Sequence, residues 1–393
     1  MATLTQSAPH LLAARNAIYA AFFANGLVVG HWAPKIPVLV ERLGITEATL
    51  GKMIILFGLG ALLALMAGAW FVTKFGSRAI LRWTSLFLAP SLVLLTLTPT
   101  VFTASLAMLW LGVFLGAMDN AMNTNGVGVE VELAKPVMSS YHGFWSLGGV
   151  AGGLTGGAMI SVLGELGHAI AVAVMVAALV TWAWPRYLAS DELDNPSEDA
   201  PLIRKGLPRQ PGIYLLGLIT LLAFAPEGTV IDWSALYLKD ELGAPLIVSG
   251  YAVAAFSATM ALMRLRGDGL RARYGDRNTF IASGLVAGLG LLIAGAGDGL
   301  IIVCIGFLIA GLGMANVVPV LFSTAGRYPG VRPTVGIAVI TTFGYAGLLF
   351  IPAFVGFIAE LYSIGIVYVA WGFIVLGIGT LGFVLPQLRG RAI

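Results

Sequence analysis

Twelve apolar runs, each long enough to cross a lipid bilayer, constrain this chain of 393 residues more than any other feature. A membrane-spanning helix needs about 20 mainly apolar residues. Because lipid offers no water to bond the backbone, each run must satisfy its own N–H and C=O groups by forming a helix. We therefore predict an all-α polytopic membrane protein with twelve transmembrane helices. The runs cover residues 13–38, 48–72, 79–98, 103–130, 137–164, 168–187, 211–237, 246–265, 279–297, 300–326, 334–359 and 362–385.

Composition indicates that lipid is the main solvent of the chain. Only 10% of the residues are charged and 58% are hydrophobic, whereas a soluble domain carries about 25% charged residues. A mean hydropathy of +0.92 also excludes a disordered chain, because disorder requires low hydrophobicity and high charge. The net charge of +3 does not indicate nucleic acid, and the single cysteine, Cys304, leaves no thiolate cluster for a metal. We expect no cofactor, and we expect the first run to be retained, since residues 1–12 lack a signal-peptide pattern.

The chain divides into two similar halves around a polar segment. Residues 188–210 are rich in charge, Ser, Asn and Pro, which predicts a solvated linker between a bundle at 1–187 and a bundle at 211–393. Lys74 to Arg78 reads KFGSR and Arg273 to Arg277 reads RYGDR, an offset of 199 residues that the first runs of the halves share. We interpret this as an internal duplication. The alternative is that short cytoplasmic turns favour basic residues and glycine independently.

Positive charges predict the orientation in the membrane. Loops on the cytoplasmic side are enriched in Lys and Arg. With a cytoplasmic N-terminus, 18 of the 22 basic residues, Arg264 included, fall on that side. An even number of spans then places both termini in the cytoplasm.

Two six-helix halves with a basic glycine loop after the second span of each half resemble the major facilitator superfamily of secondary transporters. Its loop signature has the form G-x-L-x-D-R-x-G-R-[RK]. The basic and glycine places are filled by Lys74, Gly76 and Arg78, and again by Arg273, Gly275 and Arg277. The aspartate is replaced by Thr73 and Ala272, for which Asp268 and Asp276 are candidate substitutes. The resemblance implies that these loops act in the conformational change.

Two further stretches resemble a bacterial inner-membrane branch of that superfamily, which contains YbjJ and the rhizopine-transport protein MosC. They are His142 to Gly148 (HGFWSLG), and Glu227-Gly228 with Asp232-Trp233. The resemblance implies transport of a small polar solute, such as a sugar, an inositol or an amino sugar. A related permease pattern with acids in spans one and four is half present, since Asn25 lies in the first and Asp119 in the fourth. Proton symport is the expected mode.

Three acids lie within apolar runs, and each costs about 2.5–3.5 kcal/mol at mid-bilayer on insertion scales. Asp119 lies beside Asn120 and has Asn123 one turn further along, so we predict that this group binds substrate. Glu227 follows Pro226, which weakens its helix, and we predict that it couples transport to protons. Asp232 is a second coupling candidate, with a side chain that reaches interfacial water as the alternative. Any of the three could instead be a buried acid that bonds neighbouring helices.

Several polar and aromatic side chains are weaker candidates. Aromatic rings can stack on a sugar, although at span ends they more often anchor the helix at the interface. His31 and His142 are either functional or ordinary interfacial imidazoles. We expect the cavity to be net negative and to lack a central Lys or Arg, which favours a neutral polyol or a cationic amine over an anion. The remaining candidates for substrate contact are Asn25, Asn316, Trp145, Trp233 and Tyr345.

Other function classes lack their motifs. No phosphate-binding G-x-x-x-x-G-K-[ST] loop occurs, so transport must use a gradient. The four histidines are widely spaced, which argues against a membrane enzyme. In span five, two G-x-x-x-G rows, Gly148–Gly152–Gly156 and Gly149–Gly153–Gly157, predict close helix packing. We expect a monomer that carries a small polar solute with H⁺, the alternative being proton-coupled efflux or antiport of a cationic or amphiphilic compound.

Overall fold

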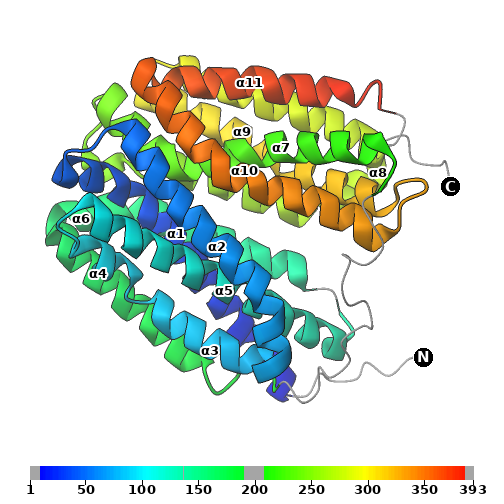
Figure 1. The fold of residues 1–393 in the computed structure, drawn as a ribbon, viewed down its shortest axis with the longest axis horizontal. Coiled ribbons are helices and arrows are strands. Elements are labelled where there is room, and N and C mark those ends of the chain that lie inside the picture. Colours follow the sequence, from blue (N-terminus) through cyan, green and yellow to red (C-terminus); the bar gives the residue numbers. More distant parts are fainter. Residues whose placement is uncertain (1–8, 136, 190–207, 386–393) are drawn as a thin grey trace.

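The computed structural model describes residues 9–135, 137–189 and 208–385. Eleven helices in this part are long and apolar enough to cross a membrane. One of them, Ser140–Ala183, has 44 residues and contains Gly164 in the left-handed region (φ 71), where the chain reverses direction. When this long helix is counted as two crossings, the described residues contain the twelve predicted transmembrane helices. The all-α fold class is confirmed (Figure 1).

The first half contains six spans. The third is divided by a break at Ala89-Pro90, because Pro90 has no N–H to donate to the helix. The sixth span is the second arm of α6. The elements are α1 Pro9–Leu43, α2 Glu47–Phe75, α3 Ser77–Leu88, α4 Ser91–Thr96, α5 Val101–Leu133 and α6 Met138–Ala183.

The second half repeats this order. Its α8 is kinked at Gly275 and so supplies two spans. The elements are α7 Pro211–Leu236, the π-helical turn η3 Tyr237–Glu241, the 3-10 turn η4 Leu246–Val248, α8 Tyr251–Ala296, α9 Leu300–Gly326, α10 Pro333–Leu361 and α11 Ile364–Leu381.

The two signature loops share one local structure. Gly76 (φ 79, ψ 147) separates α2 from α3, and Gly275 (φ 78, ψ 161) kinks α8. Residues with a side chain rarely adopt this conformation, which explains a glycine in each loop. Lys74 lies 5.3 Å from the Phe75 ring centroid, and Arg273 lies at the same distance from that of Tyr274. This equivalence supports the duplication.

The arginines of these loops bind the last span of their own half. Arg78 donates to the carbonyl oxygen of Pro185 (3.3 Å), and Arg277 donates to those of Gly382 and Phe383 (both 2.9 Å). Asp276 forms an ion pair with Arg271 (2.8 Å) and a second one with Arg327. The side chain of Asp268 lies outside the described residues. Within the structure, the loops therefore join helices of the same half, and their role in the conformational change stays a prediction.

The two glycine rows of α6 contact different helices. A Cβ at Gly152 would lie 2.6 Å from the Gly30 carbonyl carbon on α1, within the first half. A Cβ at Gly153 would lie 2.8 Å from the Gly250 oxygen, and one at Gly157 2.2 Å from the Leu246 oxygen, both in the second half. The predicted packing role therefore covers one contact within a half and one between the halves.

The halves meet at one end of the molecule, which we call the closed end and which carries Leu43 and Leu361. There Lys239 forms an ion pair with Glu41 (2.7 Å), and the Ala48 N–H donates to Glu360 (3.0 Å). Toward the opposite end, where the described chain begins at Pro9 and ends after α11, the ribbons of the two halves diverge (Figure 1). Most of the predicted linker 188–210 lies outside the described residues, so the domain boundaries stay a prediction.

Candidate functional site

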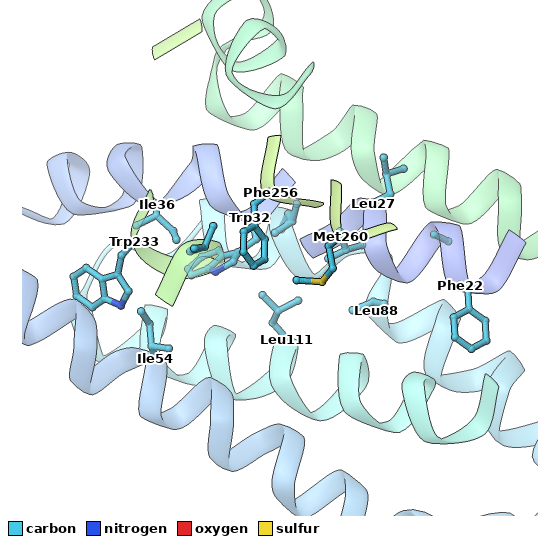
Figure 2. Close-up of a cluster of buried hydrophobic side chains, with 14 of the residues drawn as sticks. Phe22, Leu27, Trp32, Ile36, Ile54, Leu88, Leu111, Trp233, Phe256 and Met260 are labelled. Atoms are coloured by element: carbon cyan, nitrogen blue, oxygen red, sulfur yellow. The ribbon is translucent and has the colours of Figure 1, made fainter. Parts of the chain in front are cut away.

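A cavity of about 340 Å³ lies between the halves and is lined by α1, α2, α5, α6, α7 and α8. On α1 its lining residues recur every three to four positions, which places them on one helix face. Most of the lining is apolar. Figure 2 labels two lining residues, Trp32 and Leu111, and shows Trp32 near the buried Phe256 and Met260 of α8. The polar and aromatic lining residues that concern function are Asn25, Trp32, Asp119, Trp145, Glu227, Asp232 and Arg264.

Asp119 of α5 faces this cavity as predicted. The Asn123 amide donates to the Asp119 carbonyl oxygen (2.8 Å) and to its carboxylate (3.3 Å), so Asn123 orients the acid. Asn123 is not among the lining residues. Asn120 is directed toward α2, where a Cβ at Gly68 would lie 3.0 Å from its Cγ. Of the predicted trio, Asp119 alone lines the cavity in the described structure.

Asn25 and Trp145 form a polar pair on the cavity wall. The Trp145 indole donates to Asn25 Oδ1 (2.9 Å), and the Asn25 amide donates to the Leu115 carbonyl oxygen (3.3 Å). This chain of bonds fixes the asparagine side chain between α1, α5 and α6. Both residues line the cavity, and their contact with a substrate stays a prediction.

Glu227 lies in the cavity and has a cationic partner that its sequence context does not predict. Arg264 of α8 forms an ion pair with it at 3.2 Å, and both side chains are largely buried. The expectation that the cavity lacks a central cation is therefore wrong. An apolar run that ends at residue 265 predicts an inner-loop position for Arg264, whereas α8 continues to the kink at Gly275.

Asp232 is buried, with 8% of its surface exposed. The Trp32 indole donates to its Oδ1 at 3.0 Å, which joins α1 of one half to α7 of the other. The alternative that this acid reaches interfacial water is therefore wrong. Asp232 also lines a second cavity of about 70 Å³, together with Thr229 and Trp233.

Trp233 and Asn316 are not among the lining residues of the large cavity. Trp233 is fully buried and lines the small cavity. Asn316 of α9 is buried against Gly267 of α8. A Cβ added at Gly267 would lie 2.2 Å from the Asn316 Oδ1 atom. The side chain of Tyr345 lies outside the described residues.

The two candidate histidines belong to packed regions of the first half. His31 Nδ1 and His168 Nε2 are 3.0 Å apart, and both rings are fully buried. His142 packs edge-on against the Phe22 ring at a centroid distance of 5.1 Å. Neither candidate is among the lining residues of the large cavity.

A buried ion network near the closed end was not predicted. Glu165 of α6 bonds Lys35 at 2.8 Å and Arg42 at 3.1 Å, and the Lys35 side chain is fully buried. Lys35 lies inside an apolar run, and such a charge requires a buried partner. Lys35 in an apolar run therefore indicates a buried ion pair. The sequence does not identify its partner, because Glu165 lies 130 residues further along the chain.

Comparisons with known proteins agree with this architecture. Residues 18–267 match the Major Facilitator Superfamily. An uncharacterized MFS-type transporter of Yersinia pestis is 33% identical over 349 residues, 88% of this chain and 89% of that protein. The membrane protein MosC of Rhizobium meliloti is 31% identical over 352 residues, 88% of this chain and 83% of that protein.

Solved structures share the fold. The nucleoside transporter NupG superposes with a TM-score of 0.73 at 12% identity, covering 96% of this chain and 99% of that one. A D-xylose-proton symporter gives 0.72 at 13% identity, covering 98% and 100%. The family match over most of the chain and the relatives above 30% identity show that this protein is a secondary transporter of the major facilitator superfamily, in the branch that contains MosC.

Proposed function

We propose that the protein is a proton-coupled symporter of a small polar solute, such as a sugar, an inositol or an amino sugar, and that it works by alternating access. The observation that carries the proposal is the cavity between the halves, with Asp119 contributed by one half and Glu227 by the other. Its volume of about 340 Å³ falls in the range of small-molecule sites, about 300–1,000 Å³. A site formed by both halves can change its access when they move relative to each other.

The cavity wall supplies the contacts that a hydroxylated ring needs. Asp119 and Asn25 offer oxygen acceptors, and Trp145 offers a flat face for stacking. Arg264 adds guanidinium donors, which widens the solute class to compounds that also carry a partial or full negative charge. A solute that displaces the Arg264–Glu227 pair would be recognised by both groups.

For the orientation, we propose that the closed end faces the periplasm and that both termini lie in the cytoplasm, in the bacterial inner membrane. Basic residues support this, because they concentrate at the end where the described chain begins and ends. The structure then corresponds to a conformation with the outer end closed.

For the coupling, a proton gradient supplies enough free energy. Each charge moved across the membrane contributes about 2.3 kcal/mol per 100 mV, and each pH unit adds about 1.4 kcal/mol. Glu227 is the coupling acid expected from the sequence, but it forms an ion pair with Arg264 at 3.2 Å, which protonation of Glu227 would break. This pairing argues against Glu227 as the group that takes up and releases the proton.

Reconstituted protein in proteoliposomes tests the proposal. We expect counterflow of at least one solute from a panel of myo-inositol, D-xylose, D-glucosamine and uridine, and accumulation when the outside is made acidic. Asp119→Asn should abolish counterflow, whereas Asn316→Ala, a buried polar residue away from the cavity, should leave it measurable. Accumulation only with an acidic inside would establish the antiport alternative instead.

A further inference from the structure

Asp232 holds a position that neither of the other cavity acids has. It lines the large cavity and also the small one, which extends toward the closed end between α2, α7 and α10. Both cavities lie between the halves, and Asp232 is the one acid among their described lining residues that borders both. The surroundings of a group at this contact change when the halves move.

The partners of the three acids differ in charge. Glu227 is paired with the Arg264 guanidinium at 3.2 Å. Asp119 accepts from Asn123 of its own helix, so its partner moves with it. Asp232 accepts from the Trp32 indole, a neutral donor that belongs to the other half. Among the described contacts of these acids, only that of Asp232 must break when the halves separate at the closed end.

Few charged or titratable groups face Asp232. On its own helix, Glu227 is more than one turn away and is neutralised by Arg264 of α8. Asp119 of α5 lines the same cavity, and Tyr368 of α11 donates to the Thr229 carbonyl oxygen beside it (3.1 Å). The residues that α2 and α10 contribute to the two cavities are uncharged. No cation in the described lining other than Arg264 competes for the Asp232 carboxylate.

We propose that Asp232 carries the coupled proton and that Trp32 is the positioning residue that makes its release depend on conformation. This inference rests on the proposed symport function. With the outer end open, Asp232 has lost the indole donor, and its carboxylate accepts a proton from periplasmic water. When that end closes, the Trp32 N–H again bonds Oδ1 and favours the ionised carboxylate, so the proton leaves to water in the large cavity.

The link between protonation of Asp232 and its bond to Trp32 also makes closure of the closed end depend on pH. Because the ionised carboxylate stabilises the closed end, protonation of Asp232 must favour its opening by the same factor. We therefore expect the periplasmic accessibility of the contact between the halves to rise as pH falls. The cluster of Ala33, Ala235 and Val253 joins α1 to α7 and α8 there, and all three residues are buried.

Thiol labelling tests this inference without a transported solute. Ala235→Cys, in a Cys304→Ser background, is treated with a membrane-impermeant maleimide in right-side-out vesicles between pH 5 and pH 9. Because maleimide reacts with the thiolate, each labelling rate is divided by the rate with free glutathione at the same pH. The normalised rate should rise about tenfold toward low pH, the ratio that corresponds to about 1.4 kcal/mol. In Asp232→Asn the normalised rate should be constant across the range. Trp32→Phe, which keeps a ring but removes the donor, should also lose the pH dependence.

Glu227→Gln is the matched control and should keep the pH dependence of labelling. A pH dependence that survives in Asp232→Asn, or that is lost in Glu227→Gln, would overturn the assignment to Asp232. A pH dependence retained in Trp32→Phe would overturn the role of the indole. Failure of every panel solute in counterflow would instead refute the proposed function, since the labelling result does not depend on it.

Discussion

An added methyl group at Gly250 should open the closed end. A Cβ at this position would lie 2.1 Å from the Gly153 oxygen and 2.9 Å from its carbonyl carbon, in the other half. Both atoms are backbone, so relief requires the helices to separate. Overpacking of this kind costs about 1–3 kcal/mol, and a cost of ~2 kcal/mol shifts a conformational equilibrium by about 30-fold. Because this contact joins the halves, the cost falls on the conformation in which they touch.

Gly152→Ala is the matched control, because its Cβ would lie 2.6 Å from Gly30 within the same half. That contact has to persist whichever end is open, so this variant should lower thermal stability without changing access. Both variants are compared by maleimide labelling of Ala235→Cys at pH 8 and by the unfolding temperature in detergent. We expect faster labelling for Gly250→Ala only. Unchanged labelling in that variant, with a lowered unfolding temperature, would refute the assignment of this glycine row to a contact that opens.

Three further predictions concern the cavity and the orientation. Asp119→Ala should abolish solute uptake in proteoliposomes while membrane insertion and monodispersity stay normal, because removal of a buried acid relieves a desolvation cost; normal uptake would reduce Asp119 to a structural residue. Glu227→Ala and Arg264→Ala should each lower the unfolding temperature, and the double variant should lose less than the sum, with a coupling energy of about 0.5–3 kcal/mol in a double-mutant cycle; additive losses would show that the pair contributes nothing. Cysteines at Arg332 and Arg42 should be labelled from opposite sides of the membrane, Arg332 from the cytoplasm, and the reverse pattern would invert the proposed orientation.

The spans and the duplication were accessible from the sequence because both depend on local features. A run of about 20 apolar residues can only be a helix in lipid, and a glycine in a basic turn marks the same left-handed corner in each half. The end of a span is harder to locate, because a long helix tolerates a buried charge that has a partner. Arg264 was assigned to a loop for this reason.

Only some of the residues that line the cavity can be predicted from the sequence. The reason is that neighbouring residues on a helix point in different directions. Successive residues on a helix point about 100° apart, so an acid that faces the cavity directs the next residue elsewhere. Asp232 and Trp233 show this, as do Asp119 and Asn120. The contact between Trp32 and Asp232 spans 200 residues of sequence and depends on how the halves pack. No local pattern in the chain carries that information.

The most direct test of the central claim is proton-driven accumulation by the purified protein. Proteoliposomes with an inside pH of 8 are diluted into buffer at pH 6, and the uptake of the solute identified by counterflow is followed with and without a protonophore. We predict accumulation above the external concentration that the protonophore abolishes. Equilibration to the external concentration at the same rate in both conditions would contradict proton-coupled symport.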